Sequence, residues 1–164
     1  MDFTVREPVV ADAGAVADLH VSTWQEAYSH LLPADYFTDE YVDSRHRMWN
    51  HVLMNPRDDV IVRVAEVDGI MIGFAWAGPS LGDTGEEVPR QRQLYAIYVA
   101  AAHYGRGVGQ VLLDDVLGAE RAMLWVAREN PRAMAFYIRN GFQFDGAEQV
   151  DPHAPAITDA RMIR

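Results

Sequence analysis

The sequence predicts an α/β fold in which one mixed β-sheet carries helices on both faces, and residues 1–164 are expected to form a single domain. Short apolar or alternating runs, bounded by glycine, proline and polar residues, are typical of strands. They are interspersed with segments of helical periodicity, in the order β, α, α, β, β, β, α, β, α, β, β. Such an order favours a sheet covered on both faces, and 164 residues are enough for one core.

The first third of the chain is expected to form one strand and two helices. A strand is expected at residues 3–6, a helix capped by Asp12 follows it, and a second helix covers residues 40–54. Residues at helical spacing predict the inward faces: Val16, Leu19 and Thr23 in the first helix, and Tyr41, Met48 and Val52 in the second.

The middle of the chain reads as a β-hairpin and a further strand. Residues 60–67 and 70–77 are mostly apolar, and Asp68-Gly69 between them suits a type I′ turn. A loop rich in glycine, proline and acidic residues follows at 79–90, and a strand is expected from about Gln91 to Val99.

This strand leads into the most informative segment, Tyr104-Gly-Arg-Gly-Val-Gly-Gln110, which opens a helix. Alternating glycines remove side chains where the backbone turns, so that several N–H groups can converge beside the positive end of the helix. This arrangement binds phosphate groups. The dinucleotide motif Gly-x-Gly-x-x-Gly is excluded because Gln110 replaces its third glycine, and the chain contains no Gly-Lys-Ser/Thr.

The helix after the glycine loop and the elements that follow complete the expected sheet. The helix presents Val108, Val111, Leu112 and Val116 on one face. Strands are expected near residues 122–127, 142–148 and 157–163. Between the first two lies a helix over 131–140, which Asn130 can cap, Pro131 can begin and Asn140-Gly141 can end.

Composition narrows the class of protein. There is no cysteine, which rules out disulfides and thiolate chemistry, and we expect no metal site. The net charge of −10 disfavours nucleic acid as a partner and favours a cationic small molecule or peptide, although negative charge also serves solubility. Neither a secretory signal nor a membrane span is apparent, so the expectation is a cytoplasmic protein that does not bind membranes.

Two motifs resemble those of the GNAT superfamily of N-acetyltransferases. Gly-x-Gly-x-Gly after a strand is similar to the acetyl-CoA loop of that family, and Asn130-x-x-Ala-x-x-Phe-Tyr followed by Gly141-Phe142 is similar to its later helix. The likeness is good over residues 60–164 and extends to 21–33. It implies a mostly antiparallel, splayed sheet, acetyl-CoA as cofactor, and acetyl transfer to a primary amine by direct attack in a ternary complex.

The resemblance also implies which residues hold the cofactor. The strand Ile97-Tyr98-Val99 would pair with the pantetheine arm, and the amide of Tyr98 or Val99 would face the acetyl carbonyl. The other residues implied in cofactor binding are Tyr104, Gly105, Arg106, Gly107, Val108, Gly109, Gln110, Asn130, Ala133, Phe136 and Tyr137, and Arg132 could meet a phosphate. Tyr104 departs from the family, which usually has Gln or Arg there.

Tyr137 is the predicted catalytic residue. By the resemblance it would be the general acid that protonates the leaving thiolate, which a phenol can do with only a modest difference in pKa. The alternative is a helix tyrosine that packs its ring in the core.

The general base is not evident. Many family members have Glu near the position of Gln93, and Gln cannot accept a proton. The candidates are a water chain or one of five side chains: His20, His30, Asp83, Glu86 and Glu87. Alternatively, the acceptor is less basic, such as an aryl amine or an α-amine.

The acceptor site is expected near Trp24, Tyr28, Tyr95 and Gln93, since aromatic faces can hold a cation, whereas Trp76 is assigned to the core. Two other functions stay open: a non-catalytic acyl-CoA sensor or partner subunit, and an unrelated nucleotide-binding domain. A homodimer is also open, because family members often pair.

Overall fold

The computed structural model describes residues 2–82 and 87–164, and it has the predicted fold class: a seven-stranded, open, mostly antiparallel sheet with helices on both faces. The strands are β1 (Thr4–Arg6), β2 (Ile61–Val67), β3 (Ile70–Pro79), β4 (Arg92–Val99), β5 (Met123–Ala127), β6 (Gln143–Asp151) and β7 (Ala154–Ile163). The helices are α1 (Ala13–Tyr28), α2 (Asp39–Met54), α3 (Val108–Val116) and α4 (Pro131–Arg139), with short 3₁₀ turns at Val10–Asp12 and Ala101–His103. The predicted order of elements is confirmed.

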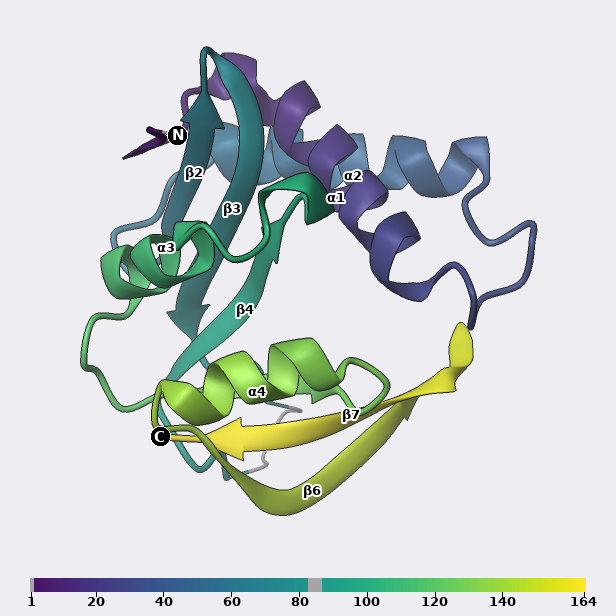
Figure 1. Cartoon of the computed structure of the whole chain (residues 1–164), viewed down its shortest axis with the longest axis vertical. Coiled ribbons are helices and arrows are strands. Elements are labelled where there is room, and N and C mark those ends of the chain that lie inside the picture. Colours follow the sequence, from purple (N-terminus) through teal and green to yellow (C-terminus); the bar gives the residue numbers. More distant parts are fainter. Residues whose placement is uncertain (1, 83–86) are drawn as a thin grey trace.

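The sheet order is β1-β2-β3-β4-β5-β7-β6, and its neighbours are antiparallel except for β4 and β5. Helices α3 and α4 lie on the near face in Figure 1, while α1 and α2 pack together on the opposite face. None of the helices in the described ranges is long and apolar enough to cross a bilayer.

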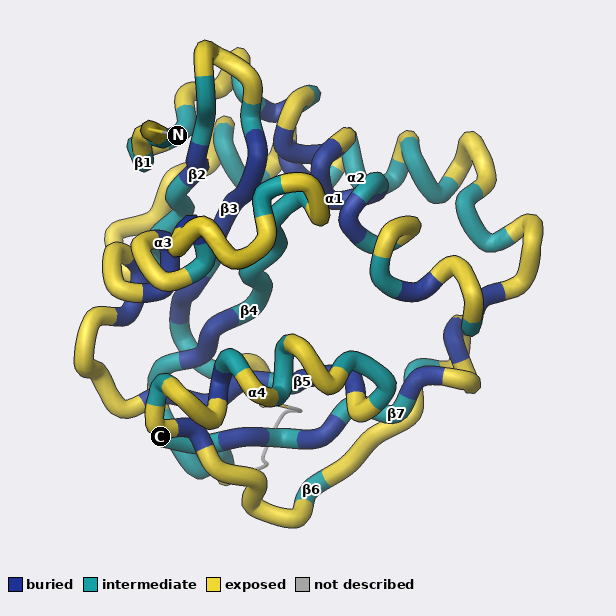
Figure 2. Tube along the Cα trace, viewed as in Figure 1, coloured by how far each residue is buried: buried dark blue, intermediate teal, exposed yellow. Residues whose placement is uncertain are grey.

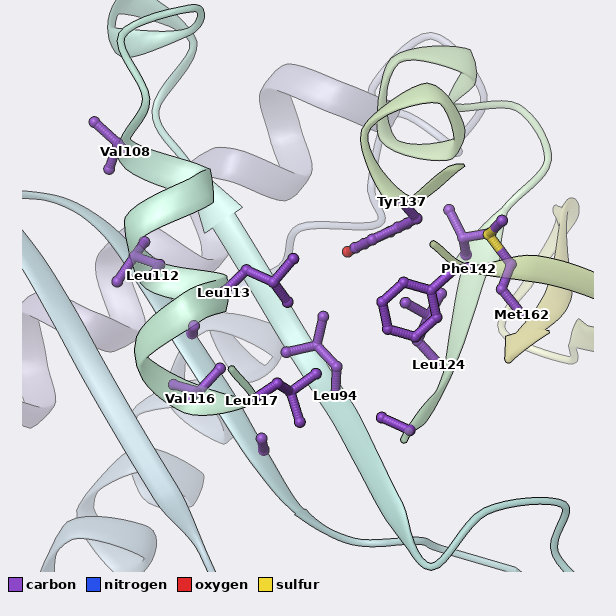
Figure 3. Packing of buried hydrophobic residues seen from close by; sticks show 14 of the residues in the cluster. Leu94, Val108, Leu112, Leu113, Val116, Leu117, Leu124, Tyr137, Phe142 and Met162 are labelled. Carbon is purple, nitrogen blue, oxygen red and sulfur yellow. The ribbon is translucent and has the colours of Figure 1, made fainter. Parts of the chain in front are cut away.

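Figure 2 shows buried residues along the strands and the helices, and they form separate cores on the two faces of the sheet. On the α3 face, Leu112, Leu113 and Val116 pack toward Leu94 and the residues around Phe142 (Figure 3). The prediction that Val111 belongs to this inward face is wrong, because its side chain is 43% exposed. The buried residues of α3 are Val108, Leu112, Leu113 and Val116, so Leu113 takes the inward place that was assigned to Val111.

On the other face, Trp49 of α2 is fully buried between α1 and the sheet, and its ring lies 5.1 Å from that of Phe74. The expected inward residues Met48 and Val52 flank it but are only partly buried. Trp76 packs in the same cluster, as the assignment to the core anticipated.

Two local predictions have opposite outcomes. Asp68 and Gly69 both have positive φ, 50° and 77°, which confirms the type I′ turn. Asp12, in contrast, does not cap α1 with its side chain. Its carboxylate accepts hydrogen bonds from Arg6 and from the backbone N–H of Val9 instead, because an ion pair with β1 is within its reach.

The decisive feature of the sheet is the short contact between its two halves. Strand β4 pairs with β5 only at Gln93–Met123 and Leu94–Leu124. Beyond Leu94 the two parallel strands separate, and no strand of residues 2–82 and 87–164 pairs with that edge of β4. This separation opens the sheet in the middle, and α1 and α4 lie at its two sides (Figure 1).

Candidate functional site

A cavity of about 950 Å³ occupies the opening between β4 and β5. It reaches from the glycine loop and the start of α4, on one face of the sheet, to Trp24 and Tyr28 of α1 on the other. Every residue predicted to bind the cofactor or the acceptor lines this cavity, with the exception of Arg106. The structure therefore brings together side chains that lie more than 100 positions apart in the sequence.

The glycine loop has the backbone that the sequence pattern predicts. Gly105 and Gly107 have φ of 74° and 82°, a left-handed conformation that other residues adopt only with strain. Gly107 is the N-cap of α3, and the first helical hydrogen bond runs from the Val111 N–H to its carbonyl. The amides of the preceding residues, Val108 to Gln110, thus have no partner within the helix and lie at the wall of the cavity.

The free edge of β4 presents the amides of Ile97 and Val99 rather than that of Tyr98. The Ala100 N–H donates to Ile72 of β3 at 2.8 Å, and the Tyr98 carbonyl also faces β3, where it lies against Gly73. Because N–H groups alternate between the two edges of a strand, those of Ile97 and Val99 face the opening. Of the two amides named from the sequence, that of Val99 therefore faces the opening, and its contact with an acetyl carbonyl stays a prediction.

Tyr137 lies on α4 with its ring edge-on to Phe142, and its hydroxyl lines the cavity. The hydroxyl is directed away from Phe142 and toward the side of α3 (Figure 3). Within the described ranges no side-chain hydrogen bond acts on this hydroxyl. Burial, together with Tyr98 and Tyr28, raises the pKa of Tyr137 above its ordinary value, so that the phenol stays protonated.

Two hydrogen bonds tie α1 to the two sides of the opening. The Trp24 indole N–H donates to the hydroxyl of Tyr98 on β4 at 3.1 Å. The Asn130 side-chain NH₂ donates to the hydroxyl of Tyr28 at 3.2 Å, while its Oδ1 accepts from the Ala133 N–H and caps α4. Asn130 is therefore the N-cap that the sequence predicts, and it binds Tyr28 as well.

Other side chains at the cofactor end of the cavity are fixed by neighbours. The guanidinium of Arg132 lies over the ring of Tyr104, 3.2 Å from its centroid. The Gln110 amide donates to Asp114 and Asn140, so it joins α3 to the end of α4. The ring of Phe136 packs against Gly109.

The acceptor side of the cavity is shaped by a β-bulge. Trp76 pairs with Ala96 and Ala77 pairs with Leu94, which leaves Tyr95 as the extra residue on β4. A bulge reverses the alternation of side chains, so the Tyr95 ring packs against Trp76 on the α1 face, and its hydroxyl donates to the Pro79 carbonyl. Gln93 is buried, and its Oε1 accepts a hydrogen bond from the Leu81 N–H at 2.9 Å.

The candidate bases differ in position. His20 is buried, its Nδ1 accepts a hydrogen bond from the Trp49 indole at 3.1 Å, and burial lowers its pKa to about 4. His30 and Glu87 are exposed and do not line this cavity. Asp83 and Glu86 lie outside the described residues.

A second cavity of about 530 Å³ adjoins the first and shares Trp24 and Tyr98 with it. It lies between α1, α2 and the tip of the β6–β7 hairpin. The remaining residues that line it are mostly aromatic or charged: His20, Tyr36, Thr38, Glu40, Tyr41, Ser44, Arg45, Asp151 and His153.

Comparison with known families agrees with this geometry. The family model described as "Acetyltransferase (GNAT) domain" matches residues 58–144, which is more than half of the chain and includes both motifs. The chain belongs to the GNAT family of acetyltransferases. Enzymes of this family use acetyl-CoA as the acetyl donor.

Individual GNAT relatives support the same assignment. The chain is 29% identical over 143 residues to the uncharacterized N-acetyltransferase YuaI of Bacillus subtilis. The aligned region covers 82% of this chain and 76% of YuaI. It is 20% identical to a spermidine N(1)-acetyltransferase of Thermoplasma acidophilum, with 92% and 94% of the two chains covered. This chain also superposes on a crystal structure of the PaiA N-acetyltransferase of the same organism in complex with coenzyme A, with a TM-score of 0.70 and 18% sequence identity. The superposition covers 100% of this chain and 99% of the PaiA chain.

Among the residues of the GNAT cavity that sequence reasoning does not identify are Trp125 on β5 and Asp159 on β7. Neither belongs to a motif, and Asp159 stands in a strand that reads as a plain C-terminal β-segment. The periodicity of β7 could have placed Asp159 on one face of the sheet, but only the separation of β4 from β5 turns that face into a cavity wall.

Proposed function

We propose that this protein transfers the acetyl group of acetyl-CoA to a primary amine of a small molecule or peptide, by direct attack while both substrates are bound. The observation that carries the proposal is the continuous cavity through the sheet. A phosphate-binding loop and an open strand edge lie on one side, and an aromatic wall lies on the other. A donor and an acceptor can therefore meet between β4 and β5, which supplies the proximity that acyl transfer requires.

The residues present fit acetyl-CoA. The unpaired amides at the start of α3 and the positive φ of Gly105 and Gly107 suit a pyrophosphate. The free edge of β4 suits the amides of an extended pantetheine arm, as an added strand would. Bound acetyl-CoA supplies an activated acetyl thioester.

In this proposal, each group of the chain has a separate task. The Val99 N–H, which faces the opening, would donate to the acetyl carbonyl oxygen as negative charge develops there. Tyr137 would give its proton to the sulfur as the C–S bond breaks, and its raised pKa keeps that proton available. Trp24 and Tyr28 would hold α1 against both sides of the opening.

A second candidate, a non-catalytic acyl-CoA binder, is favoured by one observation. Gln93 occupies the strand position where a carboxylate base is common in the family, and its amide is tied to the Leu81 backbone. The unpartnered hydroxyl of Tyr137 supports catalysis instead, because mere binding of acyl-CoA needs no proton donor at the sulfur.

The test is a thiol-release assay with acetyl-CoA and a panel of primary amines, with mass spectrometry of the amine. Thiol release that depends on the amine, together with a mass increase of one acetyl group, is the result that the proposal predicts. Binding of acetyl-CoA without acetylation of any amine would favour the binder.

A further inference from the structure

Asp159 is the carboxylate of interest on the acceptor side of the cavity. It stands on β7, opposite Ala127 at the end of β5, and its side chain lines the 950 Å³ cavity together with Trp24, Tyr28 and Tyr98. Burial raises the pKa of both tyrosine hydroxyls, and the negative charge of Asp159 raises it further. Within the described ranges it is the one acidic residue that lines this cavity.

Neighbouring carboxylates have partners that Asp159 lacks. Asp145 forms an ion pair with Arg161 at 2.6 Å, and Glu148 forms one with Arg128. The carboxylate of Glu129 accepts hydrogen bonds from the Thr158 N–H. In the described part of the chain, the side chain of Asp159 takes part in no ion pair or hydrogen bond. It is therefore an uncompensated negative charge at the wall of a cavity, which is costly unless a ligand compensates it.

The groups that face Asp159 do not neutralise it. Glu129 lies in the turn between β5 and α4, and Asp151 lies on β6; both disfavour its ionised form. Tyr28 and Tyr98, from α1 and β4, are neutral hydroxyls. Burial and the two carboxylates together raise the pKa of Asp159 above its usual range, which makes it a stronger base than an exposed aspartate.

The walls beside Asp159 suit a cation. Rings of Trp24, Tyr95 and Trp125 line the same cavity. An ammonium group gains from aromatic faces and more from a charge-assisted hydrogen bond to a carboxylate. Of the described base candidates, His20 is committed to Trp49, and the others lie away from the cavity.

We propose that Asp159 binds the ammonium group of an alkyl primary amine and accepts one of its protons before the nitrogen attacks. This inference rests on the proposed acetyltransferase function. An N–H bond breaks, the electron pair stays on the nitrogen, and the proton passes to a carboxylate oxygen and then to water. An alkyl amine needs this step because it is charged at neutral pH, whereas an aryl amine is already neutral. Asp159 therefore selects alkyl over aryl amines.

The test compares Asp159→Asn and Asp159→Glu with Glu148→Gln, which removes a carboxylate from the same hairpin but outside the cavity. The probes are benzylamine and spermidine as alkyl amines and aniline as the aryl amine. We expect Asp159→Asn to lower kcat/KM for the alkyl amines by about 100-fold or more at pH 7. For aniline we expect a loss of less than about 10-fold. Asp159→Glu should restore part of the activity, and Glu148→Gln should stay within about twofold of the wild type.

The outcomes separate this inference from the proposed function. If the wild type acetylates alkyl amines and Asp159→Asn does so equally well, Asp159 is not the base, but the transferase stands. Faster turnover of aniline than of either alkyl amine overturns the assigned acceptor class. A wild type that binds acetyl-CoA but acetylates no amine overturns the transferase proposal, and this inference with it.

Thermal unfolding supplies a readout that is independent of activity. Since the folded-state pKa of Asp159 is raised, the unfolded chain loses this proton first, and ionisation opposes folding at every pH above the ordinary pKa of aspartate. Asp159→Asn should therefore melt at a higher temperature than the wild type at pH 7, and the gain should shrink as the pH falls toward 4. A lower melting temperature at pH 7 would mean that the carboxylate has a stabilising partner, which contradicts the inference.

Discussion

The side chain of Asn130 donates a hydrogen bond to the hydroxyl of Tyr28 across 3.2 Å, and this contact joins the start of α4 to the end of α1. Helix α4 is connected to the β5 side of the opened sheet, while α1 packs on β3 and β4. The hydrogen bond thus bridges the two halves where β4 and β5 no longer pair. Asn130 therefore both caps α4 and connects it to α1.

This bridge can be tested through stability. Tyr28→Phe removes only the hydrogen bond and should cost about 0.5–1.5 kcal/mol in the free energy of unfolding. Asn130→Ala removes both the bond and the cap, so it should cost about 1–2 kcal/mol. Urea denaturation of both variants and the double variant measures the coupling. Strictly additive costs would show that the contact contributes nothing.

Tyr137→Phe tests the general acid. Loss of the hydroxyl should lower kcat by roughly 10- to 10,000-fold and leave the Kd for acetyl-CoA unchanged, because the ring packing against Phe142 remains. Tyr36→Phe, which alters a hydroxyl outside this cavity, is the matched control. Wild-type turnover by Tyr137→Phe would remove this residue from the mechanism.

Gly107→Val tests the phosphate loop. A valine at φ of 82° is strained and places a side chain at the start of α3, so the affinity for coenzyme A should fall by about 10-fold or more. Gly146→Val imposes a similar strain at φ of 94° on β6, away from the cavity. Calorimetric titration should show normal affinity in the second variant. Equal affinities in both would mean that the pyrophosphate binds elsewhere.

His20 makes stability depend on pH. Its pKa falls from 6.5 to about 4 because burial opposes the charged ring. Between these values the unfolded chain binds a proton that the folded chain does not, so the free energy of unfolding falls as the pH drops from 6.5 toward 4. His20→Gln should have a flatter profile over this window in denaturation experiments from pH 7.5 to 4.5. An unchanged slope would contradict the assignment.

The sequence predicts the fold class, the order of elements and most of the cavity wall, because glycine spacing, helix caps and apolar periodicity are local signals. The positive φ of Gly107 and the cap by Asn130 follow from such signals. The bulge at Tyr95 does not, because it depends on the register between β3 and β4. Asp159 was not predicted for a similar reason: its role follows from the separation of two strands, which no local pattern encodes. Asp12 was predicted as a cap, but a partner in another element, Arg6, binds it instead.

The most direct test of the central claim is a thermal-shift measurement with acetyl-CoA, coenzyme A, NAD and ATP side by side. A ligand that binds only the folded chain must raise its melting temperature. We predict a rise with acetyl-CoA and coenzyme A that far exceeds the rise with NAD or ATP. An unchanged melting temperature with both coenzyme A species would contradict the assignment of the opened sheet and its glycine loop to the acetyl donor.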